Sequence, residues 1–540
     1  MKERCLVIPA IKKNAIIPDQ LVKKLAGKTL IQRALDTARS VSQPHDIYVL
    51  TDSQEITLIA ERAQVLVHTN QSIRFTSLDI VQEMRELLQE LAKKYTYCII
   101  YRASCPLITW VDIEDAWKTY RKNNCDTLIT VKKVKQRLWN IEQGELQELL
   151  DGKEESYVVE SRSLIMLKLS QLDSANCTIM PYFLDEHAIE IQGYQDWRIC
   201  GRLLMRRHVV FVVAGYPAIG MGHVYRALML AHEITNHKIT FVATKASTLA
   251  VENIATRDYP VVRQGEEELS QTVLSLHPDL VVNDFLNTEA HYMQELKNHG
   301  LHLVNFEDEG EGTKFADLVI NALYENCTST QKMRYGAQYF CLRDEFLEAS
   351  RNPLRSQVKT LLITFGGTDQ CDSTRRVLTI VEPICRAYGI KIKVVVGRGY
   401  AHKETLESYI KDLENPLIQF TWATNVMSRM MENCDLAICS AGRTVYELAH
   451  MRIPALVLAT HEREAKHTFA RPKNGFAFVG IMRQVKDTKI RNVFLAMLKQ
   501  ERRARFWSKQ NDLDFVPNKA RVIDLLEDLL KREEENSFVC

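Results

Sequence analysis

The chain has no long run of basic residues, no apolar run near the roughly eighteen residues that a membrane span needs, and no Cys-x-x-Cys spacing. Lys and Arg number 70 against 68 Asp and Glu, for a formal net charge of +2, so nothing points to nucleic acid as a partner. No signal peptide is recognised, and 13 cysteines, an odd number, suit a reducing compartment. We expect a cytoplasmic protein with neither a membrane span nor a nucleic-acid partner.

Internal repeats and low-complexity tracts are also missing. A chain of 540 residues is too long for one hydrophobic core and long enough for three α/β lobes. We expect the domain boundaries to give four segments: 1–205, 206–350, 351–510, and a C-terminal helix with its tail at 511–540.

The most informative stretch that is present is Gly220-Met221-Gly222-His223. It follows an apolar run, 208–215, and precedes a segment of helical apolar spacing, 224–234, which predicts strand, glycine loop and helix. Glycines at a helix start let the backbone approach an anion such as a diphosphate. A histidine there, with an ordinary pKa of about 6.5, suits a general base. The alternative is a histidine that caps a turn in an ordinary nucleotide-binding loop.

Short apolar strands alternate with helical patterns from residue 208 to about residue 500, which predicts an α/β fold of two doubly wound lobes. The expected strands are 209–213, 239–243, 280–283, 301–306 and 318–321, then 360–365, 391–396, 418–422, 436–439 and 455–459. Ligands of such sheets collect at the carboxyl ends of strands. Residues of note at those ends are 220–223, Asp284, 365–369, 397–399 and 440–444.

With these motifs in order, residues 208–500 resemble the GT-B-fold nucleotide-sugar enzymes. Within that group they resemble the UDP-sugar hydrolase of pseudaminic acid biosynthesis and its spore-coat-polysaccharide relatives. The matching pieces are Gly220 to His223 with Arg226, 282–285, 342–346, 364–369, 425–427, 435–438 and, best of all, 440–447.

The resemblance implies a UDP-sugar held between two Rossmann-like lobes, with the diphosphate on the second lobe and Glu447 towards the ribose hydroxyls. His223 is then the candidate base, with Asp284 as a second catalytic candidate. No metal or cofactor is required in that scheme. Candidate nucleotide or sugar contacts are Gly220, Gly222, Arg226, Gly366, Gly367, Thr368, Asp369, Gly442, Arg443, Thr444 and Glu447. Where relatives carry an Asn-Gln, this chain has His461-Glu462-Arg463-Glu464, so the sugar or the acceptor can differ.

Three of these residues have plainer interpretations. Asp284 at a strand end can cap the following turn, Arg226 can be a surface helix residue, and Glu447 can lie on a solvated helix face.

Residues 1–205 form a further α/β domain, with strands expected at 5–9, 47–50, 65–68, 98–101, 127–131 and 164–167. This segment resembles the nucleotidyltransferases that make CMP-activated acid sugars. The resemblance is carried by 7–10, 26–31, 49–52, 104–108, 189–191 and Asp196-Trp197.

Two departures from that family stand out. The loop 11–20 lacks the glycines that present amides to a triphosphate, with Ile11, Ala15 and Gln20 at the positions of the family's arginine and two lysines. Where relatives hold magnesium with aspartates, the chain has Ser104, Glu190 and Gln192, and losing carboxylates weakens Mg²⁺ binding. Remaining candidate ligand contacts are Lys12, Lys13, Lys28, Asp52, Arg102, Ser104 and Glu190. Mg²⁺ is expected only if this domain is active, and we favour a decayed domain kept for binding or scaffolding.

Several functions remain open from the sequence. They are a hydrolase that releases a free amino sugar from UDP, a glycosyltransferase using a UDP- or CMP-sugar, a bifunctional enzyme with CTP-dependent sugar activation, and a non-catalytic nucleotide-sugar scaffold. Expected partners are a UDP-sugar and, for the first domain, CTP or a CMP-sugar; a homodimer is left open.

Overall fold

The computed structural model describes residues 2–12, 17–70, 80–123, 125–135, 137, 139–142, 144–148, 157–172, 174, 177–184, 187–216, 220–324, 328–424 and 426–537. The chain forms two compact units, Met1–Arg206 (unit 1) and Arg207–Cys540 (unit 2). Within the described residues, no helix combines the length and the apolar character that a membrane crossing requires.

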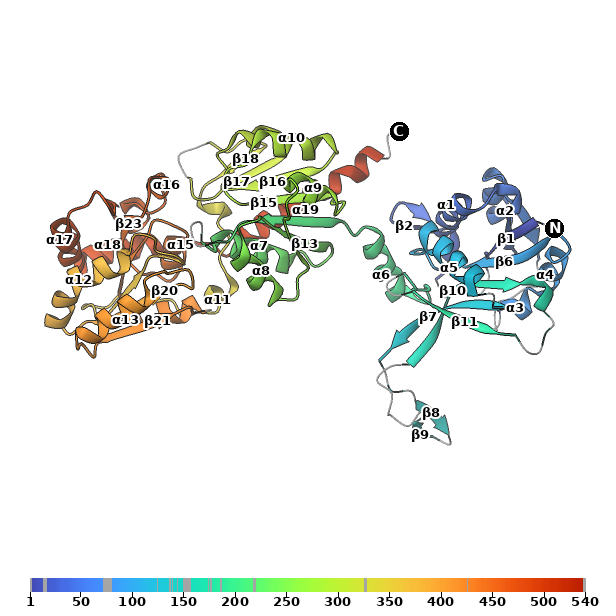
Figure 1. Ribbon diagram of the computed structural model, residues 1–540, viewed down its shortest axis with the longest axis horizontal. Coiled ribbons are helices and arrows are strands. Elements are labelled where there is room, and N and C mark those ends of the chain that lie inside the picture. The colour runs from blue at the N-terminus through green and yellow to red at the C-terminus, as the bar shows by residue number, and fades with distance from the viewer. Residues whose placement is uncertain are drawn as a thin grey trace. The chain divides into compact units, whose positions relative to one another are not determined.

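Unit 1 is built on a seven-stranded sheet of order β11-β7-β10-β6-β1-β4-β5 (Figure 1). β10 runs antiparallel to both of its neighbours, whereas β6, β1, β4 and β5 are mutually parallel. Alternate residues of β1 face opposite sides, Leu6 and Ile8 in one apolar cluster and Cys5 and Val7 in another, so both faces of the sheet are covered. The strands are β1 (Lys2–Pro9), β4 (Ile47–Thr51), β5 (Leu66–Thr69), β6 (Tyr95–Tyr101), β7 (Thr127–Val134), β10 (Tyr157–Lys168) and β11 (Ile179–Phe183).

The helices of unit 1 pack on those two faces. Helix α1 begins behind Thr29, whose side chain accepts the Gln32 amide while the Gln32 side chain accepts the Thr29 amide. The helices are α1 (Leu30–Val41), α2 (Gln54–Arg62), α3 (Ile80–Glu83), α4 (Arg85–Leu91), α5 (Trp110–Asn123) and α6 (Tyr194–Leu204). The sequence analysis did not predict β11 or the short hairpins β2 (Lys24–Leu25) with β3 (Lys28–Thr29) and β8 (Trp139–Glu142) with β9 (Glu145–Glu148).

The first lobe of unit 2 carries an all-parallel sheet of order β14-β13-β12-β15-β16-β17-β18. Such a sheet is buried on both faces, and its strands are accordingly runs of Val, Ile, Leu and Phe. The strands are β12 (His208–Val213), β13 (Lys238–Ala243), β14 (Val261–Arg263), β15 (Leu280–Asp284), β16 (His302–Phe306), β17 (Leu318–Asn321) and β18 (Met333–Tyr335). The helices are α7 (Gly222–Glu233), α8 (Thr248–Ala255), α9 (Leu269–Leu274), α10 (Ala290–Asn298) and α11 (Asp344–Leu347).

The second lobe repeats this plan with a parallel sheet of order β21-β20-β19-β22-β23-β24. The strands are β19 (Thr360–Thr364), β20 (Lys391–Val396), β21 (Ile418–Trp422), β22 (Leu436–Cys439), β23 (Ala455–Ala459) and β24 (Phe476–Ile481). The helices are α12 (Ser373–Ala387), α13 (Lys403–Asp412), α14 (Met427–Met431), α15 (Thr444–His450), α16 (Glu462–Ala465), α17 (Asp487–Met497) and α18 (Gln500–Asn511). The expected α/β class and the two Rossmann-like lobes are thus confirmed; β14, β18 and β24 were not predicted.

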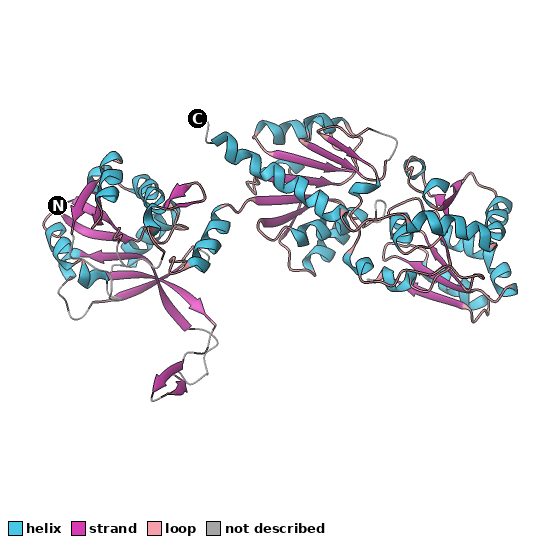
Figure 2. Cartoon of the chain, turned by 180° about the vertical axis from the view of Figure 1, so that it is seen from behind, coloured by secondary structure: helices cyan, strands magenta, loops and turns pink. Residues whose placement is uncertain are grey.

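The last helix, α19 (Asn518–Ser537), returns to the first lobe (Figure 2). Its residues Val522, Leu526, Leu529 and Leu530 are buried in the same apolar cluster as the β12 residues Val209, Phe211 and Val213. The helix therefore completes the core of a lobe whose other elements lie between residues 208 and 347.

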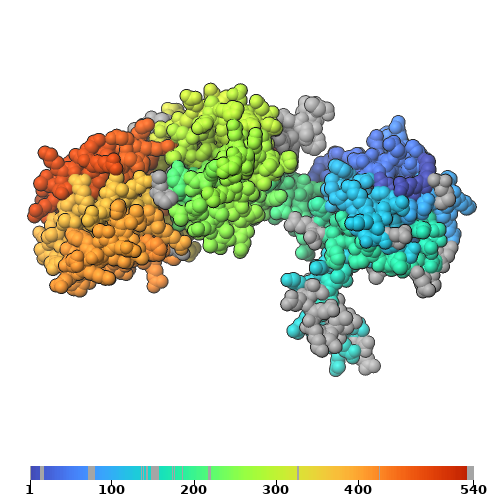
Figure 3. All heavy atoms as spheres, viewed as in Figure 1, coloured from blue at the N-terminus to red at the C-terminus, as the bar shows by residue number. Residues whose placement is uncertain are grey.

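The connector 349–357 between the lobes is fastened to the second lobe. The Asn352 side chain donates to the main-chain oxygens of Met431 and Met451, and the Trp507 indole donates to the Asn352 oxygen. The two lobes are in contact in the space-filling view (Figure 3). At this end the connector is therefore packed against the second lobe.

His450 of α15 is buried where this connector meets the second lobe. Its Nε2 donates to the Phe346 oxygen at 3.1 Å, and its Nδ1 accepts from Arg351 at 3.4 Å. Burial, together with the Arg351 charge, lowers the pKa of His450 to about 4. The unfolded chain, with a histidine pKa of about 6.5, takes up this proton before the folded chain does.

We therefore expect this residue to weaken the fold as the pH falls from about 6.5 to about 4. The variant H450Q keeps a donor and an acceptor but cannot titrate. In denaturant unfolding of the full chain at pH 7 and pH 5, the wild type should lose about 1–2 kcal/mol more stability than H450Q. Equal losses in the two proteins would contradict a buried neutral His450.

Candidate active site

The glycine loop at the start of α7 depends on backbone conformation at Gly220 and on close packing at Gly222. Gly220 has a φ of +81°, a conformation that side-chain-bearing residues avoid. A Cβ on Gly222 would lie 3.2 Å from Cδ of Arg443, which comes from the second lobe. Gly222 thus allows an arginine of one lobe to approach the helix start of the other, next to His223.

His223 is bonded to a buried carboxylate. Its Nδ1 lies 2.6 Å from Oδ1 of Asp284, the last residue of β15. A carboxylate only accepts hydrogen bonds, so Nδ1 is the donor, and in the neutral imidazole Nε2 carries the lone pair. The histidine side chain is 14% exposed, and the aspartate is 1% exposed. The two candidate catalytic residues are therefore brought together.

Arg226 donates two further hydrogen bonds to the Asp284 carboxylate. Residues three apart on a helix share a face, so Arg226 and His223 both reach Asp284. Arg226 donates from Nε to Oδ2 at 2.7 Å and from Nη2 to Oδ1 at 2.6 Å. Burial alone would raise the pKa of Asp284, but the charges and hydrogen bonds of Arg226 and His223 outweigh it and the pKa is lowered. Arg226 is buried and is no surface residue, and Asp284 binds side chains of α7 instead of capping a turn.

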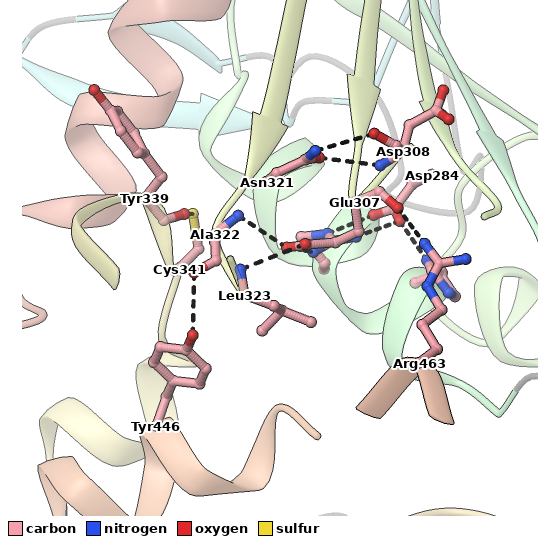
Figure 4. A network of polar contacts seen from close by, with 12 residues as sticks. Asp284, Glu307, Asp308, Asn321, Ala322, Leu323, Tyr339, Cys341, Tyr446 and Arg463 are labelled. Carbon is pink, nitrogen blue, oxygen red and sulfur yellow. Dashed lines mark hydrogen bonds and ion pairs between the residues drawn. The ribbon is translucent and has the colours of Figure 1, made fainter. Parts of the chain in front are cut away.

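A second buried carboxylate, missed in the sequence, extends this network. Glu307 follows β16, has a φ of +51°, and accepts from Arg226 at 3.0 Å. Its carboxylate also accepts the amides of Ala322 and Leu323 (Figure 4). The sequence signal was an acidic residue directly after a buried strand, which Glu307 shares with Asp284.

Two hydrogen bonds from the second lobe reach this network, one at Glu307 and one at Ala322. Arg463 of α16 donates to the main-chain oxygen of Glu307, and the Tyr446 hydroxyl donates to the Ala322 oxygen at 3.0 Å (Figure 4). The Tyr446 ring stacks between Phe340 and Phe469, with ring centroids 4.0 Å away on each side. Arg463 belongs to the segment 461–464, which therefore contributes to the lobe interface.

Arg443 is the candidate whose charge is least satisfied. Its guanidinium lies over the Phe340 ring at 4.7 Å, and no described residue makes a hydrogen bond or ion pair with it. Burial and the repulsion of Arg226 lower the pKa of Arg443 to about 10. A cation held in this way favours the arrival of an anion.

Glu447 contacts protein instead of solvent. It is 9% exposed and accepts from Arg343 at 2.9 and 3.0 Å, so the solvated interpretation was wrong. Arg343 also pairs with Glu345 at 2.6 Å. A role of Glu447 towards ribose hydroxyls stays a prediction.

Two loops at strand ends of the second lobe pack tightly against each other, and the first of them carries Gly366, Gly367 and Thr368. A Cβ on Gly397 would lie 2.5 Å from Cα and O of Gly367, so the loops after β19 and β20 touch. Gly366 (φ +84°), Gly367 and Thr368 are exposed or half-buried in the loop after β19, and Gly442 and Thr444 are half-buried after β22. Asp369 was expected to contact the ligand, but its two oxygens accept the Ser373 and Thr374 amides at 2.9 and 2.8 Å and so hold the start of α12.

A hollow of about 250 Å³ opens beside the Glu307 network. Its walls include Asp308, Asn321 and Tyr324, which sit at the carboxyl ends of β16 and β17 or just beyond. Both carboxylate oxygens of Asp308 already accept hydrogen bonds, which come from Thr288, Asn305 and Gly310. The walls of the hollow thus combine these polar groups with the side chains of Tyr324, Met333 and Tyr335.

The lysine candidates of unit 1 are neutralised by carboxylates. Lys12 Nζ lies 2.9 Å from Glu55 and 3.0 Å from Asp19, and its amide donates to Asp52 at 2.7 Å. Lys28 pairs with Asp36 at 2.8 Å. Both lysines have carboxylate partners in the structure, and their role as phosphate ligands stays a prediction. Lys13 lies outside the described residues.

The other candidates of unit 1 form one cluster. Glu190 accepts from Arg102 at 2.8 Å and from Ser104 at 3.3 Å. The sequence analysis did not single out Arg162, whose guanidinium lies 3.4 Å from Glu190. Buried Gln20 donates to the Ile191 oxygen.

One group among the described residues could hold a metal ion by distance alone. Ligand atoms of Glu268, His291 and Glu295 lie within 4.8 Å of one another, with the first two residues exposed. None of the three belongs to the strand-end residues described above.

Two family descriptions match parts of the chain. Residues 15–173 match Cytidylyltransferase, and residues 360–492 match the Glycosyltransferase family 28 C-terminal domain. The two matches fall in unit 1 and in the second lobe of unit 2.

In three relatives, about a quarter of the aligned residues are identical to those of this chain. An uncharacterised protein of Methanocaldococcus jannaschii is 26% identical over 272 residues, 47% of this chain and 56% of the relative. The spore coat polysaccharide biosynthesis protein SpsG of Bacillus subtilis is 27% identical over 275 residues, 48% of this chain and 80% of the relative.

The third relative, of Helicobacter pylori, is named pseudaminic acid cytidylyltransferase and UDP-2,4-diacetamido-2,4,6-trideoxy-β-L-altropyranose hydrolase. It is 25% identical over 190 residues, 33% of this chain and 34% of the relative. The chain thus spans about half the length of the archaeal relative and a third of this one. Together with the family matches, these relatives identify the chain as a fusion of a cytidylyltransferase-like domain with a glycosyltransferase family 28-like domain.

Proposed function

We propose that unit 2 hydrolyses a UDP-amino sugar at its anomeric carbon, with His223 as the general base. The observation that carries this proposal is the 2.6 Å bond between His223 Nδ1 and buried Asp284, itself clamped by Arg226. This bond sets the tautomer and the ring orientation, and it stabilises the imidazolium that forms when Nε2 takes a proton.

The reaction follows from these groups. Nε2 of His223 accepts a proton from water, the water oxygen forms a bond to the anomeric carbon, and the bond from that carbon to the diphosphate oxygen breaks. UDP leaves with the electron pair, and the guanidinium of Arg443 offsets its negative charge. The Asp284 carboxylate stays ionised throughout, as its lowered pKa requires.

One observation favours water over a lipid-linked acceptor. The Helicobacter relative carries a UDP-sugar hydrolase in its name. Transfer to a sugar hydroxyl needs the same base and is the alternative.

For unit 1 we favour a ligand-binding domain over a working CTP-dependent transferase. Its lysines are paired with carboxylates, and Glu190 is paired with arginines. A surface-sugar pathway of the bacterial type suits the pair of domains, because the Bacillus and Helicobacter relatives are named for such pathways. A bifunctional enzyme or a pure scaffold are the remaining alternatives.

We expect H223A to lose turnover about 10²–10⁴-fold while keeping its affinity for UDP within a few-fold, because the base touches water and not the nucleotide. The full chain is incubated with UDP-2,4-diacetamido-2,4,6-trideoxy-β-L-altropyranose in ¹⁸O-water, and UDP release is followed by ³¹P NMR. Hydrolysis at carbon places the label on the sugar. H232A, an exposed histidine of the same helix, is the control, and unchanged turnover of H223A would overturn the assignment.

Arg443 should govern nucleotide affinity. R443A removes a charged donor, so calorimetry should show UDP binding weakened by about 1.5–3 kcal/mol. R375A removes an exposed arginine of α12 in the same lobe and should leave the affinity unchanged. Equal affinity of R443A and the wild type would remove Arg443 from the diphosphate site.

The role of Glu447 in UDP binding can be tested by comparing its variant with a variant of Arg343, its partner in the structure. If its carboxylate binds ribose hydroxyls, E447A should weaken UDP binding by about 1–3 kcal/mol, whereas R343A should leave most of the affinity in place. Matching losses in both variants would show that the Arg343–Glu447 pair acts only by holding the lobe together.

A further inference from the structure

Unit 1 contains a cluster of two arginines around one carboxylate. Oε1 of Glu190 accepts from Arg102 at 2.8 Å and from Ser104 at 3.3 Å. Oε2 accepts from Gln192 at 3.2 Å and lies 3.4 Å from Arg162. The Nε atoms of Arg102 and Arg162 are buried and have no hydrogen-bond partner. The cluster carries one more positive charge than negative, with donor capacity left over.

Arg162 stands in an unfavourable backbone conformation. Its φ is +60°, at an irregularity of β10 between Glu160 and Ile165. Left-handed backbone is disfavoured for a residue with a side chain, whereas glycine adopts it freely. The chain therefore keeps an arginine where glycine would be more stable, which is typical of a residue held for its side chain.

The cluster lies at the ligand edge of the sheet. Arg102 directly follows β6, one of the parallel strands whose carboxyl ends form that edge. The Ile191 amide donates to the Ser104 oxygen, and buried Gln20 holds the Ile191 oxygen. The segment that carries Glu190 is thus fixed in place beside the loop of Arg102 and Ser104.

This donor set does not fit a magnesium ion. Mg²⁺ takes hard oxygen ligands, usually one or two carboxylates together with phosphates. Among the described residues of this cluster, Glu190 is the single carboxylate, and both of its oxygens already face guanidinium groups. A divalent cation on Glu190 would sit within a few ångströms of two positive charges.

We propose that Arg102 and Arg162 form an oxyanion site in which the phosphate or carboxylate of a ligand replaces Glu190 without a divalent cation. Guanidinium groups recognise both anions through paired N–H donors. The two sources are a cytidine nucleotide and an acidic sugar. Glu190 acts as an internal competitor that keeps the arginines in position until the ligand arrives. The inference concerns unit 1 and does not depend on the reaction proposed for unit 2.

The test is calorimetric titration of the full chain with CMP, CTP and N-acetylneuraminate, each in EDTA and in Mg²⁺, with uncharged cytidine as the control. We expect CMP or N-acetylneuraminate to bind equally well in EDTA and in Mg²⁺, and cytidine to bind at least about tenfold more weakly. CMP binding alone identifies a phosphate site, and binding of the sugar acid alone identifies a carboxylate site. Absence of binding by all charged probes would overturn the proposal, as would binding that needs Mg²⁺.

Two variants have effects of opposite sign. E190Q removes the competing charge and should tighten binding, whereas a metal site would lose affinity with this change. R162G removes one guanidinium and relieves the backbone, so it should weaken binding about tenfold or more while raising the melting temperature by about 2 °C or more. R162K, which keeps the charge, should retain part of the affinity.

The variants also separate this site from unit 2. R443A should leave the CMP or sugar-acid signal unchanged. Weaker binding by E190Q, or a lower melting temperature of R162G with unchanged affinity, would contradict the proposed exchange and assign Arg162 a structural role.

Discussion

The buried carboxylate of Asp284 is the constraint on which the first lobe of unit 2 depends. An ionised group at 1% exposure is tolerable only when cations and donors surround it. His223 and Arg226 supply them from successive turns of α7, which fixes how that helix is rotated on the sheet. The requirement that stabilises the carboxylate is the same one that orients the imidazole, so fold and site share one set of bonds.

Arg226 also binds the buried carboxylate of Glu307, and Glu307 in turn contacts the second lobe. The need to neutralise buried charge therefore extends to the lobe interface. Two contacts across that interface, from Arg463 and Tyr446, end on main-chain oxygens. Such contacts depend on where the backbone of the partner lies and not on its side chains. The positive φ of Glu307, next to one of these oxygens, is therefore part of how the lobes fit together.

The sequence predicted the long apolar strands of the three large sheets because burial on both faces leaves an unmistakable run of Val, Ile and Leu. Three-residue β14 and β18 are too short for such a signal, and β24 contains Gly480 at a register shift. The pairing of His223 with Asp284 follows from strand ends meeting at one edge. The partners of Glu447 and Glu190 could not be foreseen, since Arg343 lies 104 residues away and the Arg162 geometry arises from an irregular strand.

The return of α19 makes the first lobe discontinuous along the chain. A ribosome would complete β12 to β18 and the whole second lobe before the residues that cover Val209 and Phe211 emerge. Until then this lobe exposes apolar surface, and its core closes only at the end of synthesis. A fragment that ends near residue 515 would carry every residue of the candidate active site and still lack Val522, Leu526, Leu529 and Leu530 from the core beneath it.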